Sequence, residues 1–103
     1  MSFNGNESEV ITLQEGIDWT TNYRNANPNE TKAHFFGKEK LQDILDQADC
    51  VGIRMYYAID DNGAKQLVLV GASADEEDLY NGVLLDRAKP CPNYCSNSSP
   101  LNS

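Results

Sequence analysis

The sequence predicts an α+β fold, with two N-terminal helices packed on an antiparallel meander of three or more strands and followed by an extended C-terminal tail. Up to about residue 48 the apolar residues recur at helical spacing, whereas from residue 50 they occupy every second position. A turn sequence at residues 60–64 separates two apolar runs. Helices followed by strands, rather than alternating with them, are typical of the α+β class.

The length of 103 residues indicates a single domain. We expect a flexible N-terminus at residues 1–9, the α+β domain at residues 10–88, and a tail rich in Pro, Cys, Ser and Asn at residues 89–103. The first helix begins after Thr12, because Thr12 and Glu15 have the spacing of a capping box. It ends before Pro28, which disfavours helical geometry in the residue before it.

Residues 32–36 form either a short strand or an extended lead-in to the second helix. Gly37 interrupts this segment, and the second helix is predicted from about residue 38 to residue 48. Its core-facing stripe consists of Leu41, Ile44, Leu45 and Ala48.

Two strands joined by a hairpin are the best-defined part of the predicted sheet. Residues 50–59 alternate, residues 60–64 carry Asn and Gly, which tolerate a tight turn, and residues 67–72 are apolar on both faces. Residues 75–78 are interpreted as a solvated acidic loop, and residues 83–85 as a third strand. If helices cover only one face of the sheet, the tail or a second copy of the chain must cover the other.

The net charge of −8 argues against nucleic acid as a partner, because the eight basic residues are scattered among sixteen acidic ones. There is no apolar run of the roughly 20 residues that span a bilayer, and no signal-peptide pattern. We therefore expect no membrane partner and a location in the cytoplasm, where thiols are usually reduced.

Cys91 and Cys95 are the first place to look for chemistry, since they flank a proline-containing turn. Three interpretations remain open: inert packed thiols, a disulfide or redox pair, or a structural zinc site. The zinc site would need His34 and Cys50 as the remaining ligands. No other cofactor is expected.

No nucleophile-elbow, phosphate-loop, dinucleotide-binding or zinc-protease motif occurs, so we expect no enzymatic activity. Arg54 and Tyr56 share one face of a strand, a composition common in protein interfaces. With Phe36 and Tyr94 they form the expected interaction face. The sequence thus favours a non-enzymatic module that binds a partner protein or itself as a homo-oligomer. The alternative is a thiol-redox or zinc-binding protein.

Four segments together resemble a family of short, uncharacterised bacterial proteins of the Bacteroidetes type with a PCPxYC ending. They are KAHFFGK (32–38), CVGIRMYY (50–57), KQLVLVG (65–71) and PCPNYC (90–95) with PLN (100–102). The resemblance covers nearly the whole chain after residue 10 and imports no catalytic residues. It implies that the cysteine-containing ending belongs to the working protein.

Overall fold

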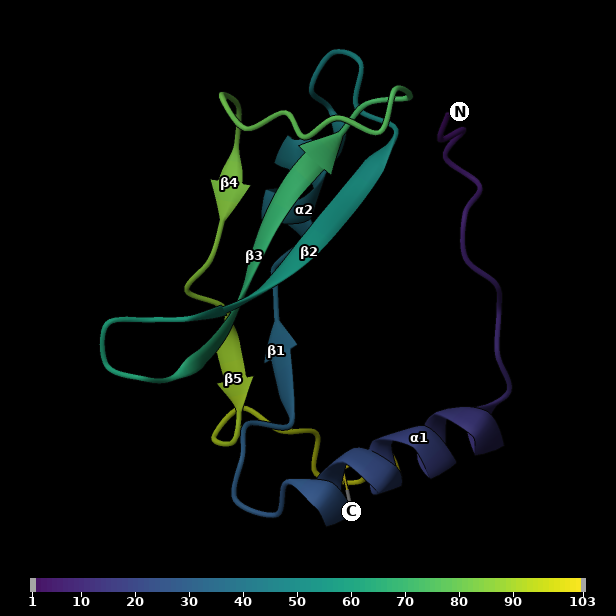
Figure 1. Ribbon diagram of the computed structural model, residues 1–103. Helices are drawn as coiled ribbons and strands as arrows, with labels where there is room; N and C mark the ends of the chain where they lie inside the picture. The colour runs from purple at the N-terminus through teal and green to yellow at the C-terminus, as the bar shows by residue number, and fades with distance from the viewer. Residues whose placement is uncertain (1, 103) are drawn as a thin grey trace. The chain divides into compact units, whose positions relative to one another are not determined.

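The computed structural model describes residues 2–102 and has an α+β fold with two helices and antiparallel sheets, as the sequence predicts. Figure 1 shows the elements in chain order. They are α1 (Leu13–Ala26), β1 (Ala33–Phe35), α2 (Lys38–Leu45), β2 (Gly52–Ile59), β3 (Lys65–Ala72), β4 (Leu84–Leu85) and β5 (Lys89–Cys91).

The described chain divides into two compact units. The first, here called the sheet unit, consists of residues 2–7 and 36–88; the second, here called the disulfide unit, consists of residues 8–35 and 89–102. The domain boundaries expected from the sequence remain a prediction, and these units follow a different partition. In particular, the C-terminal segment belongs to the same unit as α1 and β1.

The sheet unit is built on the β2–β3 hairpin. Strand order is β2-β3-β4, all antiparallel, and the hairpin register places Tyr56 opposite Val68 and Ile53 opposite Gly71. The turn closes with the Asp60 N–H donating to the Ala64 carbonyl at 2.9 Å. Gly63 has a φ of +83°, which glycine adopts without steric cost. The predicted hairpin is therefore confirmed, and β2 lies at one edge of the sheet.

One end of the hairpin carries the core of the sheet unit. Ile44 of α2 and Leu69 of β3 are both fully buried, at 0% exposure. Helix α2 makes its contacts with β2 and β3, and Figure 1 shows the hairpin turn extending beyond the part of the strands that the helix accompanies. The helix ends at Leu45, three residues before the predicted end at residue 48. The core is consequently small and confined to the α2 end of the sheet.

The disulfide unit contains α1 and a two-stranded ladder. The capping box is present, since the Thr12 hydroxyl accepts from the Glu15 N–H at 3.0 Å and the Glu15 carboxylate accepts from the Thr12 N–H at 2.9 Å. Strands β1 and β5 pair antiparallel, with His34 opposite Pro90. The segment expected to be an extended tail thus begins as a strand.

Helix α1 has no buried residue, although it was expected to pack with α2 on the sheet. The Trp19 and Tyr23 side chains are exposed, and α1 belongs to the disulfide unit rather than the sheet unit. Helix α2 packs on β2 and β3 of the meander. The apolar stripe of α1 is weak, because Gly16 and Thr20 occupy positions that a core-facing helix fills with large side chains.

Candidate functional site

Arg54 and Tyr56 lie on one face of β2, as their alternation predicts, and both reach the same carboxylate. The loop after β3 brings Asp78 back to the sheet through a bridge to Ala72, and the neighbouring Leu79 N–H donates to the Gly71 carbonyl at 2.8 Å. This placement puts the Asp78 side chain over the β2–β3 surface.

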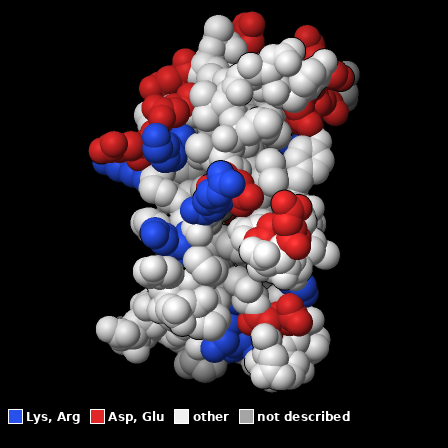
Figure 2. All heavy atoms as spheres, turned by 90° about the vertical axis from the view of Figure 1, so that its left-hand side faces the viewer, with Lys and Arg blue, Asp and Glu red and all other residues white. Residues whose placement is uncertain are grey.

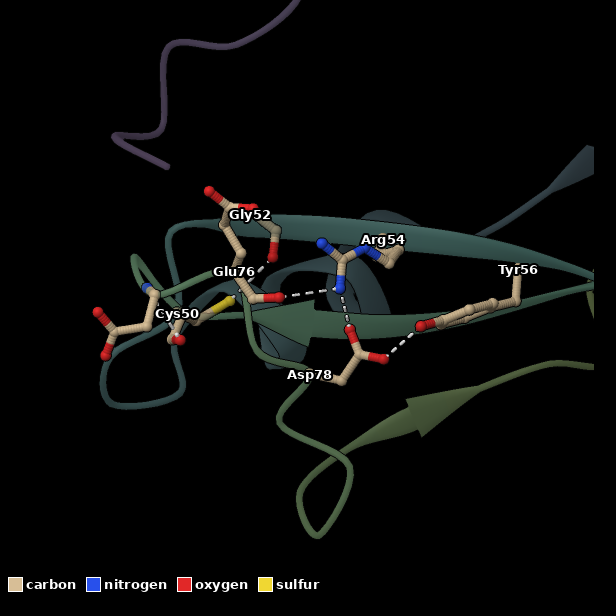
Figure 3. Close-up of polar contacts among 8 residues, drawn as sticks. Cys50, Gly52, Arg54, Tyr56, Glu76 and Asp78 are labelled. Carbon is tan, nitrogen blue, oxygen red and sulfur yellow. Dashed lines mark hydrogen bonds and ion pairs between the residues drawn. The ribbon is translucent and has the colours of Figure 1, made fainter. Parts of the chain in front are cut away.

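The three side chains form a connected cluster, here called the Asp78 cluster (Figure 3). One guanidinium nitrogen of Arg54 donates to Oδ1 of Asp78, and the Tyr56 hydroxyl donates to Oδ2 of the same carboxylate. The same Arg54 nitrogen also donates to the Glu76 carbonyl at 3.2 Å. The Phe3 ring lies 5.5 Å from the guanidinium carbon, at cation–π distance. The cluster therefore ties the loop of residues 73–79 and the N-terminal segment to β2.

The cluster shifts the pKa values of its members in the directions that its contacts require. Hydrogen bonds from Tyr56 and then Arg54 lower the pKa of Asp78, because both favour the ionised carboxylate. The hydrogen bond to Asp78 raises the pKa of Arg54 and that of Tyr56. At neutral pH Asp78 is therefore ionised while Tyr56 and Arg54 are protonated, so all the hydrogen bonds of the cluster can form. Strongly acidic and strongly alkaline pH both remove them.

Because these pKa values differ between the folded and the unfolded chain, the cluster makes the folding stability depend on pH. A carboxyl group with a lowered pKa contributes stability above its unfolded pKa of about 3.9, and that contribution is lost as the pH falls through the folded value. A phenol with a raised pKa contributes stability below about 10, and that contribution is lost as the pH rises through its folded value.

We expect Tyr56→Phe to raise the pKa of Asp78 toward its ordinary value, because the largest cause of the lowering is removed. The measurement is an NMR titration of the Asp78 side-chain carboxyl carbon. Tyr57→Phe is the matched control, since Tyr57 is on the opposite face of the strand. An unchanged Asp78 midpoint in Tyr56→Phe would contradict the assigned hydrogen bond.

The opposite face of β2 carries large, exposed and uncharged side chains. Met55, Tyr57 and Ile59 project from it at alternating positions, and their side chains are 56%, 94% and 71% exposed. We call these three residues the hairpin face. Ile53 is on the same side but at the α2 end of the strand, where it is only half-exposed. The sequence predicts this alternation, but it does not specify which face is covered.

The four residues of the expected interaction face are distributed over both units. Arg54, Tyr56 and Phe36 belong to the sheet unit, whereas Tyr94 belongs to the disulfide unit. Tyr94 is exposed, and the Lys89 ammonium lies 5.1 Å from the centre of its ring. On the side drawn in Figure 2, Lys and Arg side chains are separated by acidic and uncharged residues and form no continuous basic area.

Of the three interpretations of the cysteines, the structure has the disulfide. Cys91 and Cys95 are bonded, with Cα atoms 4.7 Å apart, inside the range that disulfides adopt. Cys91 is buried at 4% exposure, and its carbonyl accepts from the Lys32 N–H at 2.7 Å. Cys50 is a free thiol in the sheet unit, half-buried and 3.2 Å from the Gly52 carbonyl.

The zinc set of His34, Cys50, Cys91 and Cys95 is not assembled. Among residues 2–102, no three His, Cys, Asp or Glu side chains gather closely enough to hold a metal ion. The physical reason is that the sulfurs of Cys91 and Cys95 are bonded to each other, and a disulfide sulfur is no longer a thiolate ligand.

In comparisons with known proteins, no family model, no curated protein and no solved structure matches the chain. Within the described part of the chain, neither helix has the length and apolar character needed to cross a membrane.

Asp78 is the one residue of the Asp78 cluster that the sequence analysis did not identify as a candidate. Its signal was only an acid in a loop, 24 residues from Arg54, and the pairing depends on the path of the chain after β3.

Proposed function

We propose that this protein is a non-enzymatic interaction module whose docking surface is the hairpin face. The observation that carries the proposal is the exposure of three large apolar side chains, Met55, Tyr57 and Ile59, in a row on one strand. Single exposed apolar residues are ordinary, but contiguous ones mark binding surfaces because burying them releases ordered water.

The position of the strand supports the same proposal. β2 is at the edge of its sheet, so its outer backbone groups have no partner strand among the described residues. Soluble proteins usually protect long edge strands with a lysine, a proline or an inward-pointing charge. β2 has eight residues and none of these devices on the hairpin face. An unprotected apolar edge is the arrangement used in strand-addition binding.

Photo-crosslinking tests the proposal in the cells that produce the protein. A benzophenone amino acid replaces Tyr57, and a second variant carries the same group at Asn62, which is exposed in the hairpin turn. We expect adducts of one or a few defined masses from position 57 and not from position 62. Mass spectrometry then identifies each adduct as a second copy or as another protein.

Two results would contradict the proposal. The first is the absence of any defined adduct at position 57. The second is an adduct pattern at position 57 that equals the pattern at position 62, since that would indicate random collision. Met55→Ser combined with the probe at position 57 serves as an internal control, because it removes neighbouring apolar surface and should lower the yield of every specific adduct.

The alternative function, thiol redox chemistry, is favoured by one observation, the Cys91–Cys95 disulfide. Redox-active disulfides need an attackable sulfur; Cys91 is buried at 4% exposure, whereas Cys95 is half-buried, so an attacking thiol would have to reach Cys95. We propose a structural role for the bond, since half of it is shielded from solvent. Location in the cytoplasm remains a prediction, and a structural disulfide is more typical of oxidising compartments.

A further inference from the structure

The outer backbone edge of β2 is made by the same residues that form the hairpin face. In an antiparallel ladder, residues whose N–H and C=O groups point to the partner alternate with residues whose groups point away. The Asp60 N–H donates to Ala64 directly opposite, so this pair is a hydrogen-bonded one. Counting back by two along the register, Ala58 and Tyr56 point their backbone groups to β3.

Ile53, Met55, Tyr57 and Ile59 therefore direct their backbone groups to the open edge, while their side chains project from the apolar face. A strand that docks here gains main-chain hydrogen bonds and apolar contacts from the same four residues. This coincidence restricts the occupant to an extended strand with apolar side chains at alternating positions.

A second copy of β2 fits these requirements. Resting on the proposed function, we propose that the protein forms a two-fold symmetric dimer in which two β2 strands pair antiparallel about Tyr56. Around that axis Met55 of one copy lies opposite Tyr57 of the other, and Ile53 lies opposite Ile59. Each residue whose backbone groups point to the open edge then pairs with such a residue of the second copy. The hairpin faces of the two copies form one continuous surface.

Charge is compatible with this register. The chain carries a net charge of −8, so acidic side chains at the contact would add to the repulsion between two copies. β2 contains no acidic residue, and its one ionisable side chain other than tyrosine, Arg54, is paired with Asp78. Centred on Tyr56, the pairing places Arg54 opposite Ala58 of the second copy. A shift to centre on Arg54 would instead place the two guanidinium groups opposite each other.

The area predicts a modest affinity. In the paired sheet the three side chains of the hairpin face meet the second copy only across the strand edge, so each buries only part of its surface. Stable complexes typically bury about 800 Å² per partner. We therefore expect a dimer that dissociates on dilution through the micromolar range, with main-chain hydrogen bonds completing the contact.

Sedimentation velocity of the purified full chain over a concentration series tests the dimer. Two double variants test the register, because Met55 of one copy faces Tyr57 of the other. Met55→Lys with Tyr57→Glu places opposite charges across the axis, whereas Met55→Lys with Tyr57→Lys places like charges there. We expect the second variant to dissociate at a concentration roughly tenfold higher than the first.

A cysteine at the axis gives an independent readout. In a Cys50→Ser background, Tyr56→Cys brings two thiols together at a non-hydrogen-bonded pair, with Cα atoms about 4.5 Å apart. We expect rapid formation of a covalent dimer in mild oxidant. Ala58→Cys on the same face is the control, because its two thiols lie on opposite sides of the axis, separated by four residue steps of about 3.4 Å each.

The outcomes separate the two proposals. A chain that stays monomeric, that dimerises equally well in both charge variants, or that crosslinks as fast at position 58 as at position 56 would overturn this inference. Adducts from position 57 to a different protein, together with a monomeric chain, would retain the docking surface and refute the dimer. Absence of any defined adduct would refute the docking surface itself.

Discussion

We expect Gly71→Val to destabilise the sheet unit by about 3 kcal/mol, the upper end of the range for overpacked cores. Gly71 is buried where α2 crosses β3. A Cβ at this position would lie 2.9 Å from Cys50 Sγ and 3.2 Å from Ile44 Cγ2. It would also lie 3.0 Å from Nε2 of Gln47, whose Oε1 already accepts from the Val83 N–H. The valine can be accommodated only if the Cys50, Gln47 and Ile44 side chains move, and Ile44 of α2 is fully buried.

Gly52→Val is the matched control, because Gly52 is in the neighbouring strand and nothing lies within 4 Å of its added Cβ. β-branched residues are favoured in strands, so we expect this variant to be neutral or slightly more stable. Urea unfolding followed by circular dichroism measures both. Equal midpoints for the two variants would contradict the packing of α2 against Gly71.

We also expect reduction of the Cys91–Cys95 disulfide to unfold the β1–β5 ladder and to leave the sheet unit folded. The bond closes a loop with a sequence separation of 4. A loop of this size contributes about 2 kcal/mol by restricting the unfolded chain. That contribution is large here, because an isolated two-stranded ladder is only marginally stable and α1 buries no side chain.

Amide hydrogen exchange measures the effect residue by residue. We expect the Lys32 amide, which donates to the Cys91 carbonyl, and the Tyr94 amide, which donates to the Pro90 carbonyl, to lose protection on reduction. The Leu79 amide in the sheet unit should keep its protection. Cys50→Ser treated with the same reductant controls for the free thiol. Unchanged exchange at Lys32 and Tyr94 would show that the ladder does not depend on the bond.

The hairpin and the cap of α1 could be predicted from the sequence because each depends on local chemistry. Thr12 and Glu15 satisfy each other's backbone groups within one helical turn, whatever the rest of the chain does. Asp60 and Gly63 likewise make a turn from neighbouring residues, and the alternation of β2 then follows its pairing with β3. These features needed only the spacing of residues near one another in sequence.

The packing of the helices could not be predicted in the same way. Leu13 and Ile17 of α1 have helical spacing, as have Trp19 and Tyr23 on the adjoining stripe, but spacing does not specify which surface a helix contacts. In the structure α1 and β1 belong with residues 89–102, which follow them by more than fifty positions. The partner of a weakly amphipathic helix is decided by the surfaces that the completed chain offers, so it is not a local property.

For the candidate site, too, some features follow from the local sequence and others only from the tertiary structure. The sequence by itself determined the α+β class, the β2–β3 hairpin, and which residues of β2 share a face, because a strand alternates its side chains by geometry. Only the tertiary structure decided that Asp78 joins Arg54 and Tyr56, and that Met55, Tyr57 and Ile59 are left exposed. The reason is that burial and ion pairing depend on what returns to cover each face, and α2 is long enough to cover only one end of the hairpin.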